Sequence, residues 1–470
     1  MDLIYLDPPF KKQANYNILY KEPSGKQSQA QITAFEDTWH WTEEAERTFK
    51  EIIDNAPAKL VEMMIAFRKF VGINDVMAYI TMMSIRLIEL HRVLKDTGSI
   101  YLHCDPTASH YLKILMDTIF GKKNFRNEIV WGYSGGGIPT NDFPRKHDII
   151  LRYSKTDNCY YSPVYKPFTS GTIERGRTKI KGDKPLNEQG TPIPDWWFSN
   201  LECDHCEKHL STNIKRLASP TDPEKLGYPT QKTIDLLSRI IESSSEEGHV
   251  VLDPFYGCGT TVVASQMLKR NWVGIDITHL AINLIKHRLQ DMFGLQPKTD
   301  YDITGEPEDL SGARDLASLN RYQFQWWALS LINARPYQDK KKGSDTGIDG
   351  LIYFQDEKDK VQKAIVQVKS GHVTVKDIRD LVGVIGRENA EIGIFVTLVN
   401  PTRHMITEAV QKGFYKSLIF KTEHSRIQIK TIEELLKNSK LDLPPKYLAH
   451  KKAEPSDTSE QIIEQGDFDI

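Results

Sequence analysis

A strand, a glycine-rich turn and a helix follow one another between residues 249 and 268, and this order constrains the fold more than any other feature of the chain. His249–Leu252 is apolar and β-branched, which predicts a strand, and Thr260–Leu268 has the periodicity of a helix. Between them, Gly257 and Gly259 let the backbone turn tightly and approach a ligand. Because a helix N-terminus favours a negative group, this turn is suited to an anionic part of a ligand, such as a carboxylate.

An aspartate follows the next predicted strand. Trp272–Ile275 predicts that strand, and Asp276 comes directly after it, about 20 residues beyond the glycine turn, where an acidic residue suits the diol of a ribose. The order of strand, glycine turn, helix, strand and aspartate therefore predicts a site for a cofactor that contains a ribose. A glycine turn with a structural role only is the alternative.

A second motif, Asp7-Pro8-Pro9-Phe10, directly follows the short apolar strand Leu3–Leu6. Alternating strands and helices predict a parallel sheet, and such sheets bind their ligands at the carboxyl ends of the strands, where this tetrad falls. The two prolines stiffen the turn and lack backbone donors, so that carbonyl oxygens remain available as acceptors. A plain Asp-Pro turn that ends a strand is the alternative.

The tetrad has the groups that amino-group chemistry requires. A carboxylate at Asp7 and a neighbouring carbonyl can together accept two hydrogen bonds from an exocyclic amino group, which draws the nitrogen lone pair out of conjugation with the ring. The nitrogen can then attack an electrophilic methyl group. The ring of Phe10 can stack on a base that has been turned out of its helix.

Composition limits the class of protein without deciding its partner. The 470 residues suffice for two or three domains of ~150 residues, and the net charge of −2 excludes no class, because basic residues can cluster locally. The five cysteines are an odd, sparse set, which argues against a disulfide framework and for a reducing compartment. No apolar run approaches the ~20 residues that span a bilayer, and no signal peptide opens the chain. These features predict a soluble cytoplasmic protein without membrane association.

Periodicity predicts the remaining elements. Further helices are predicted at 59–95 with a break near Gly72, 109–120, 230–243, 280–292, 322–333, 375–386 and 403–412. Further strands are predicted at 99–103, 128–131, 147–153, 350–354, 363–368 and 392–396. Residues 156–227 lack periodicity and predict an irregular insertion.

Together, these motifs resemble the β-class DNA amino-methyltransferases, which use S-adenosylmethionine. In that class the catalytic tetrad precedes the cofactor loop, and a target-recognition region lies between them, as in this chain. Tyr228–Lys232 (YPTQK) is similar to the family motif that helps to bind the methionine end of the cofactor, although Thr233 stands where the family usually has proline. Asn127–Trp131 and Lys146–Asp148 are also similar to family stretches.

The resemblance implies the roles of individual residues. It implies catalytic roles for Asp7, Pro8, Pro9 and Phe10, and cofactor binding by Tyr228, Thr230, Gln231, Lys232, Asp253, Phe255, Gly257, Gly259, Thr260 and Asp276. A tetrad that begins with aspartate favours adenine N6 as the methylated atom, and cytosine N4 is the alternative. Family members carry a further strand and helix before the tetrad, with a Gly-Asp in the adenine pocket of the cofactor. Since this tetrad lies six residues from Met1, we expect a truncated reading frame or another segment that completes the pocket.

A third unit carries a different set of polar residues. Gln367 and Lys369 lie two apart on a predicted strand and so face the same side, and Asp349 on the neighbouring strand can join them. A carboxylate and an amide oxygen can hold Mg²⁺, and a lysine can orient a water for attack on a phosphate. The spacing resembles the Mrr-like branch of the PD-(D/E)xK nuclease fold, with Asp349 and Gln367 as metal ligands and Gln325 on a supporting helix.

Alternatives to a nuclease remain open for this unit. One alternative is a solvated Asp-Gly turn beside an exposed lysine. The other is a degenerate nuclease fold that binds DNA without cutting it. Asp345 is predicted to set the loop before the strand.

Elsewhere, Cys203 and Cys206, with His205 and His209, suggest zinc, but no second such pair completes the four ligands, and ordinary loop residues are favoured. His103 and Cys104 end a strand at the sheet edge, where core packing is favoured over a place in the site.

The fold class expected is therefore α/β: a Rossmann-like methyltransferase with an inserted target-recognition region, and a C-terminal restriction-endonuclease-like α/β domain. The expected boundaries are 1–155 for the catalytic half, 156–227 for the recognition insertion, 228–295 for the cofactor-binding half, 296–318 for a linker, 319–440 for the nuclease-like domain and 441–470 for a disordered tail. The expected function is site-specific adenine methylation of double-stranded DNA, fused to a Mg²⁺-dependent endonuclease of a restriction–modification system. A dimer is the expected oligomer, and a catalytically inactive DNA-binding or regulatory protein is the rival.

Overall fold

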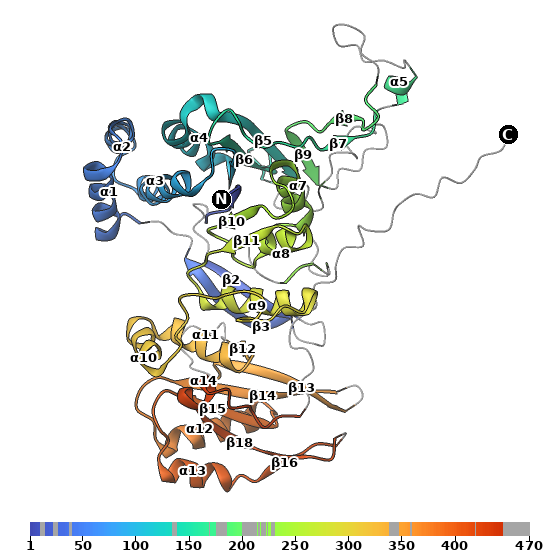
Figure 1. The fold of residues 1–470 in the computed structure, drawn as a ribbon. Helices are drawn as coiled ribbons and strands as arrows, with labels where there is room; N and C mark the ends of the chain where they lie inside the picture. The colour runs from blue at the N-terminus through green and yellow to red at the C-terminus, as the bar shows by residue number, and fades with distance from the viewer. Residues whose placement is uncertain are drawn as a thin grey trace, which may run out of the picture. The chain divides into compact units, whose positions relative to one another are not determined.

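A computed structural model gives the structure of the chain, which forms two compact units (Figure 1). It describes residues 1–9, 15–21, 27–36, 40–133, 139–168, 170–174, 186–199, 214, 217, 222, 224–226, 231–337, 347–357, 360–418 and 420–444. The first unit contains most of the chain up to Ile277, and the second unit begins at Thr278 and also takes in Leu19–Ile32 and Ser219–Tyr228. We call them the N-terminal unit and the C-terminal unit.

A seven-stranded sheet in the order β11-β10-β1-β4-β6-β5-β9 forms the centre of the N-terminal unit. Its strands are β1 (Leu3–Leu6), β4 (Ser99–Cys104), β5 (Phe125–Tyr133), β6 (His147–Ser154), β9 (Trp196–Ser199), β10 (Val250–Asp253) and β11 (Asn271–Gly274). Neighbours run parallel from β11 to β4, as the sequence predicted. The predicted parallel arrangement does not extend to β6, which is antiparallel to both β4 and β5. The connection from β5 to β6 has no helical pattern, so the chain reverses directly, as antiparallel neighbours allow.

Helices cover both faces of this sheet. They are α1 (Glu43–Asn55), α2 (Ala58–Val71), α3 (Asp75–Val93), α4 (Pro106–Met116), α7 (Ile234–Ser244) and α8 (Thr260–Met267), with short helical turns at Asp117–Gly121, Lys122–Asn124 and α5 (Ser170–Ile173). Ile4 and Leu6 pack into one large core with buried side chains of α3 and α4. On the other face, Tyr101 of β4 lies against the end of α7, where its hydroxyl is 2.7 Å from the Ser244 hydroxyl. The predicted break near Gly72 is confirmed: this residue ends α2 with a φ of +82°, which favours glycine.

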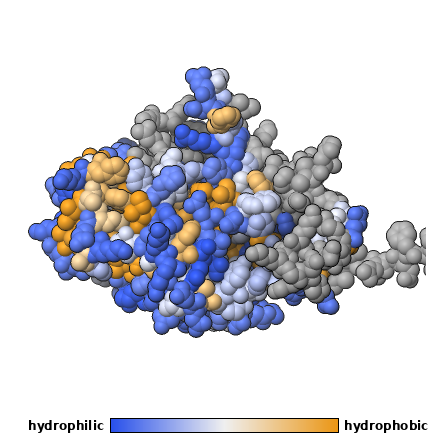
Figure 2. Space-filling model, turned by 90° about the horizontal axis from the view of Figure 1, so that it is seen from above, coloured by the Kyte–Doolittle hydropathy of each residue, from blue (hydrophilic) through white to orange (hydrophobic). Residues whose placement is uncertain are grey.

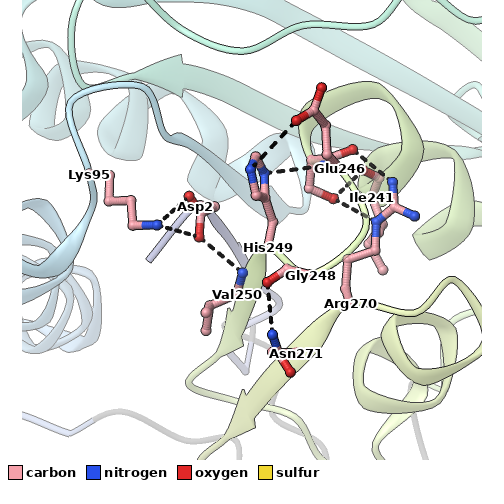
Figure 3. A network of polar contacts seen from close by, with 10 residues as sticks. Asp2, Lys95, Ile241, Glu246, Gly248, His249, Val250, Arg270 and Asn271 are labelled. Carbon is pink, nitrogen blue, oxygen red and sulfur yellow. Dashed lines mark hydrogen bonds and ion pairs between the residues drawn. The ribbon is translucent and has the colours of Figure 1, made fainter.

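A polar network at the amino-terminal edge of the sheet fixes β1 between its neighbours (Figure 3). Lys95 Nζ donates to Asp2 Oδ1 at 2.7 Å, and Asp2 Oδ2 accepts from the backbone of Val250 at 3.0 Å. Beside it, the Asn271 side chain donates to the Gly248 carbonyl at 2.7 Å. These contacts tie β1, β10, β11 and the turn before β4 together. The register they fix determines where Asp7 lies at the opposite edge.

The C-terminal unit is built around a five-stranded sheet in the order β12-β13-β14-β15-β18. Its strands are β12 (Arg335–Pro336), β13 (Gly350–Glu357), β14 (Lys360–Lys369), β15 (Ile392–Thr397) and β18 (Ile427–Thr431). Its helices are α9 (His279–Phe293), α10 (Leu310–Leu319), α11 (Arg321–Leu331), α12 (Val375–Arg387), α13 (Arg403–Val410) and α14 (Ile432–Leu436). Two cores lie on its two faces, one around the buried Trp327 and one around Leu381 and Phe395.

Three small two-stranded sheets complete the described elements: β2 (Asn15–Lys21) with β3 (Gln27–Glu36), β7 (Tyr165–Lys166) with β8 (Thr191–Pro192), and β16 (Phe414–Lys416) with β17 (Glu423–Ser425). Figure 2 shows one face of the molecule, on which hydrophobic residues form separate patches among hydrophilic ones. Within the part of the chain that the structure describes, no helix combines the length and apolar character needed to cross a bilayer.

Several predicted boundaries are corrected. Residues 296–318 are not merely a linker, because α10 begins there and buries Ala313 and Ala317; these small side chains give a weak sequence signal. The region 156–227 is not wholly irregular, since β9 joins the main sheet beside β5. The tail does not begin at 441, because the Asp442 carboxylate accepts from His424 and from the Ser425 backbone. Helix α7 begins at Ile234 and not at residue 230, because Thr233 caps it.

The structure also places α9 in a different unit from the one predicted. The helix groups with the C-terminal unit, where it packs against α11, and its first residue, His279, donates a backbone hydrogen bond to the Gln323 side chain at 3.1 Å. The sequence predicted it as part of the cofactor-binding half, because the strand–helix alternation runs on without interruption through 271–293.

Candidate active site

Asp7 and Lys232 form an ion pair at the carboxyl edge of the sheet. Asp7 directly follows the buried strand β1, and Lys232 lies two residues before α7. Lys232 Nζ lies 2.5 Å from Asp7 Oδ2, and the two side chains are only 10% and 15% exposed. The structure thus joins the first residue of the tetrad to the last residue of YPTQK, across 225 positions of sequence.

The glycine turn is fixed by the buried carboxyl group of Asp253. This residue ends β10 and is 3% exposed. Its Oδ1 accepts from the Phe255 backbone at 3.0 Å, and its Oδ2 accepts from the Thr261 hydroxyl at 2.5 Å. Gly259 caps α8 in the left-handed conformation, at a φ of +76°, which favours glycine. The predicted turn and the start of the helix are therefore confirmed.

Asp276 contacts the glycine turn. It follows β11 and accepts a hydrogen bond from the Gly257 backbone at 3.1 Å. The Thr260 hydroxyl donates to the carbonyl of Lys232 at 3.3 Å. Lys232 therefore touches both motifs, the tetrad through its side chain and the glycine turn through its backbone.

The Asp253 carboxyl is expected to make stability depend on pH. Burial, and to a smaller extent the charges of Asp7 and Asp276, raise its pKa from 3.8 to about 7. Its contribution to the free energy of unfolding is thus fully present below about pH 4 and is lost as the pH rises towards 7. Asp253→Asn should remove this dependence, and each pKa unit corresponds to about 1.4 kcal/mol. The free energy of unfolding in urea, measured for the wild type and for Asp253→Asn between about pH 4 and 7, tests this expectation. The same dependence on pH in both proteins would contradict the raised pKa of Asp253.

A hydrogen-bonded network of buried and half-buried polar side chains runs from β1 across three neighbouring strands. The Tyr5 hydroxyl lies 2.9 Å from His103 Nδ1, and His103 Nε2 lies 3.1 Å from Asp148 Oδ2. The Tyr133 hydroxyl donates to Asp148 Oδ1 at 3.1 Å. Burial, the largest influence, raises the pKa of Asp148, but the hydrogen bond and charge of His103, with the charge of Lys232, lower it to about 2.

The sequence favoured core packing for His103, and the structure adds polar contacts to it. His103 is fully buried, but both of its ring nitrogens have polar partners. Sequence reasoning found the strands and missed the network. The sequence did place Tyr5, His103 and Asp148 near the ends of strands that meet at the carboxyl edge of the sheet. It could not show which of these residues contact one another, because that depends on the order of the strands.

Not every predicted site residue can be located. Pro8 is buried and Pro9 half-buried directly after Asp7, Gln231 is half-buried beside Lys232, and Phe255 packs against the main core. Phe10, Tyr228, Thr230 and Asp345 lie outside the described residues, as do the proposed zinc ligands Cys203, His205, Cys206 and His209.

In the C-terminal unit, Asp349 lies at the centre of a hydrogen-bonded group. Its Oδ1 accepts from the Gln325 side chain at 2.9 Å and its Oδ2 from the Val368 backbone at 2.6 Å. The Gln367 side-chain nitrogen donates to the Gly347 carbonyl. The structure thus brings Asp349, Gln325 and the end of β14 together, as the spacing predicted.

This group does not fit the Mg²⁺ site that the sequence predicted. It offers a single carboxylate, and both oxygens of that carboxylate already accept hydrogen bonds from the protein, whereas Mg²⁺ prefers octahedral sites built around carboxylates. Among the described residues, no three His, Cys, Asp or Glu side chains are grouped so that they could hold a metal ion. Lys369 ends β14 beside the group.

The sheet, the tetrad and the glycine turn define an α/β methyltransferase. Residues 1–287 match the family model described as N6_N4_Mtase, DNA methylase, and residues 321–437 match the one described as NACHT-associated inactive Restriction Endonuclease 1. Since the first match covers more than half of the sequence, the chain belongs to the N6/N4 DNA methylase family. It carries in addition a C-terminal domain of the inactive restriction-endonuclease type. The two resemblances that the sequence suggested are confirmed, and the expectation of a cutting domain is corrected.

Three relatives illustrate the similarity. The chain is 28% identical to Type II methyltransferase M.EcaI of Enterobacter cloacae over 48% of its length and 60% of the relative's. It is 31% identical to Type II methyltransferase M.HpaI of Haemophilus parainfluenzae, over 48% of the chain and 64% of the relative. It is 28% identical to DNA adenine methyltransferase YhdJ of Escherichia coli (strain K12), over 43% of the chain and 64% of the relative. The chain therefore spans less than two thirds of each of these relatives.

Proposed function

We propose that the N-terminal unit transfers a methyl group from S-adenosylmethionine to the N6 atom of adenine in double-stranded DNA. The observation that carries this proposal is the meeting of Asp7, Lys232 and the glycine turn at one edge of the sheet. The tetrad begins with aspartate, and YhdJ, one of the relatives, is named as an adenine methyltransferase.

The residues at this edge suit the proposed cofactor. A carboxylate at Asp276, bound to the glycine turn, is an acceptor of the kind that ribose hydroxyls need, and the start of α8 suits a carboxylate. We propose that the cofactor is held by Tyr228, Thr230, Gln231, Lys232, Asp253, Phe255, Gly257, Gly259, Thr260 and Asp276. When bound, S-adenosylmethionine supplies an electrophilic methyl group.

The proposed work of the tetrad is to prepare the amino nitrogen. Asp7 and the Pro8 carbonyl accept the two N–H groups of the adenine, which directs the nitrogen lone pair out of the plane of the ring. Lys232 holds the Asp7 carboxylate in place through the 2.5 Å contact. Pro9 fixes the turn, and Phe10 stacks on the flipped base.

The test of this proposal is the identity of the methylated base. Incubation with duplex DNA and cofactor labelled in the methyl group, followed by digestion to nucleosides, is expected to give N6-methyladenine. Label in N4-methylcytosine would assign the alternative substrate. Absence of label, together with absence of cofactor binding in calorimetry, would favour an inactive DNA-binding protein.

We propose that the C-terminal unit binds DNA without cutting it. Among the described residues of this group Asp349 is the one carboxylate, and both of its oxygens are engaged, which supports this proposal, as does the family to which residues 321–437 are similar. With Mg²⁺ and unmethylated plasmid, the chain and its Lys369→Ala variant are expected to leave equal amounts of supercoiled DNA on a gel. Mg²⁺-dependent cleavage that disappears in Lys369→Ala would contradict this.

A further inference from the structure

An open groove of about 660 Å³ lies at the outer edge of the sheet in the C-terminal unit. Its lining comes mainly from three elements: β18 contributes Ile427, Ile429 and Thr431, α13 contributes Ile406 and Val410 among others, and the charged side chains come from α14 and the residue that follows it. These elements all belong to the C-terminal unit, and none of the residues proposed for methyl transfer lines the groove.

The backbone of β18 is paired on one side only. The Gly393 N–H of β15 donates to the Arg426 carbonyl at 2.8 Å, and Gly393 lies opposite Ile427 in the parallel register. Successive residues of a strand turn their backbone groups to opposite edges, so Ile427 and Ile429 direct theirs away from β15. β18 is the last strand of this sheet, and in the described part of the chain no further strand pairs with it. Such an edge is a template for another strand.

The segment that follows α14 covers a different side of β18. Gln428 and Lys430 alternate with the groove-lining residues and so point to the opposite face of the sheet. There, the Gln428 side-chain nitrogen donates to the Asp442 carbonyl at 2.7 Å, and Lys430 Nζ donates to the Ser439 hydroxyl at 2.8 Å. Neither Ser439 nor Asp442 lines the groove, so these contacts leave it open.

The surface around the groove is complementary to itself. On α13, Ile406 and Val410 lie one helical turn apart and are 48% and 71% exposed, which forms an apolar stripe in need of cover. Arg426 directly precedes β18 and is exposed, whereas Glu433 follows the strand on the first turn of α14. When two such strands run antiparallel, the basic start of each lies beside the acidic end of the other.

We propose that two copies of the chain associate through this groove, with their β18 strands antiparallel about a two-fold axis at Ile429. The N–H and C=O groups of Ile429 exchange two hydrogen bonds with those of the partner's Ile429, which makes the two sheets continuous. Ile406 and Val410 of the two α13 helices remove one another's apolar surface from water, and Arg426 of each copy meets the partner's Glu433. Such a contact uses the same surface on both copies and closes at two.

The proposal is tested by sedimentation velocity of the full chain over a range of concentrations, without DNA or cofactor. The wild type is expected to shift from monomer to dimer as its concentration rises. Ile429→Pro removes an N–H that points away from β15 and leaves the hydrogen bonds to β15 in place, and it is expected to weaken the dimer by about ten- to a hundredfold. If circular dichroism shows that this variant does not fold, Val410→Lys, at an exposed position, takes its place with a loss in the same direction.

Charge reversal tests the antiparallel arrangement separately. Arg426→Glu and Glu433→Arg should each weaken self-association, because like charges then meet at both symmetry-related contacts. A mixture of the two variants should restore the dimer, because each contact between them again joins opposite charges. The control Lys50→Glu reverses a charge at an exposed position of α1 and should leave association unchanged.

Three results would overturn the proposal. The first is a sedimentation coefficient that stays at the monomer value at every concentration, which would leave this edge to a strand of a different protein. The second is a dimer that both Ile429→Pro and Val410→Lys leave unaffected. The third is a mixture of the two charge-reversed variants that associates no better than either variant alone.

Discussion

Asp7→Asn is expected to reduce methyl transfer by about a thousandfold while the protein still binds its cofactor. The asparagine keeps one oxygen but loses the negative charge that accepts the amino group in the proposed reaction, and removal of one preorganised electrostatic partner costs ~10²–10³ in rate. Single-turnover incorporation of labelled methyl groups into duplex DNA measures the effect, and calorimetry with the cofactor measures binding.

The matched control for this variant is Asp54→Asn. Asp54 is exposed on α1 in the same unit, so the same chemical change there should leave both the rate and the affinity unaltered. An Asp7→Asn protein that retained more than about a tenth of the wild-type rate would remove Asp7 from the catalytic group, because a loss that small is below the electrostatic effect expected.

Lys232→Met is expected to destabilise the N-terminal unit by about 3–5 kcal/mol. The Lys232 and Asp7 side chains are 10% and 15% exposed, so removal of the cation leaves a nearly buried carboxylate without its partner, which is the costly way to break an ion pair. The free energy of unfolding in urea measures this change. Lys59→Met, at an exposed position of α2, is the control and should change stability by less than about 0.5 kcal/mol.

The double variant Lys232→Met/Asp7→Asn separates the pair from its surroundings. If the loss in Lys232→Met comes from the unpaired carboxylate, the second substitution should restore a large part of the lost stability, because no charge then remains unpaired. Additive losses would mean that the Lys232 side chain stabilises the unit through contacts other than its ion pair with Asp7.

These two variants probe different consequences of one contact. Asp7 has a proposed role in chemistry, whereas Lys232 is a positioning residue that also joins the tetrad to the glycine turn. Both variants should lose activity. Only Lys232→Met should also weaken cofactor binding, since the Lys232 side chain is among the groups proposed to hold the cofactor.

The sequence by itself determined the chemistry-bearing segments, because their signals are local. The signals are a strand followed at once by Asp7-Pro8-Pro9, and a strand and glycine turn followed by a helix that begins at Thr260. They depend on neighbours in the chain: apolar runs, glycine conformations and helix starts. The family and the parallel core of the sheet followed from the order of these segments. So did the pairing of Asp349 with β14 in the C-terminal unit.

The tertiary structure alone decided what those segments meet. The contact of Asp7 with Lys232 joins residues 225 positions apart, and the chain Tyr5–His103–Asp148 crosses strands whose order and direction no local pattern encodes. The reversal of β6 places Arg152 opposite Tyr101. Local propensity selects which residues form a strand, whereas burial and hydrogen bonding between distant strands select their neighbours, and the environment of each site residue depends on those neighbours.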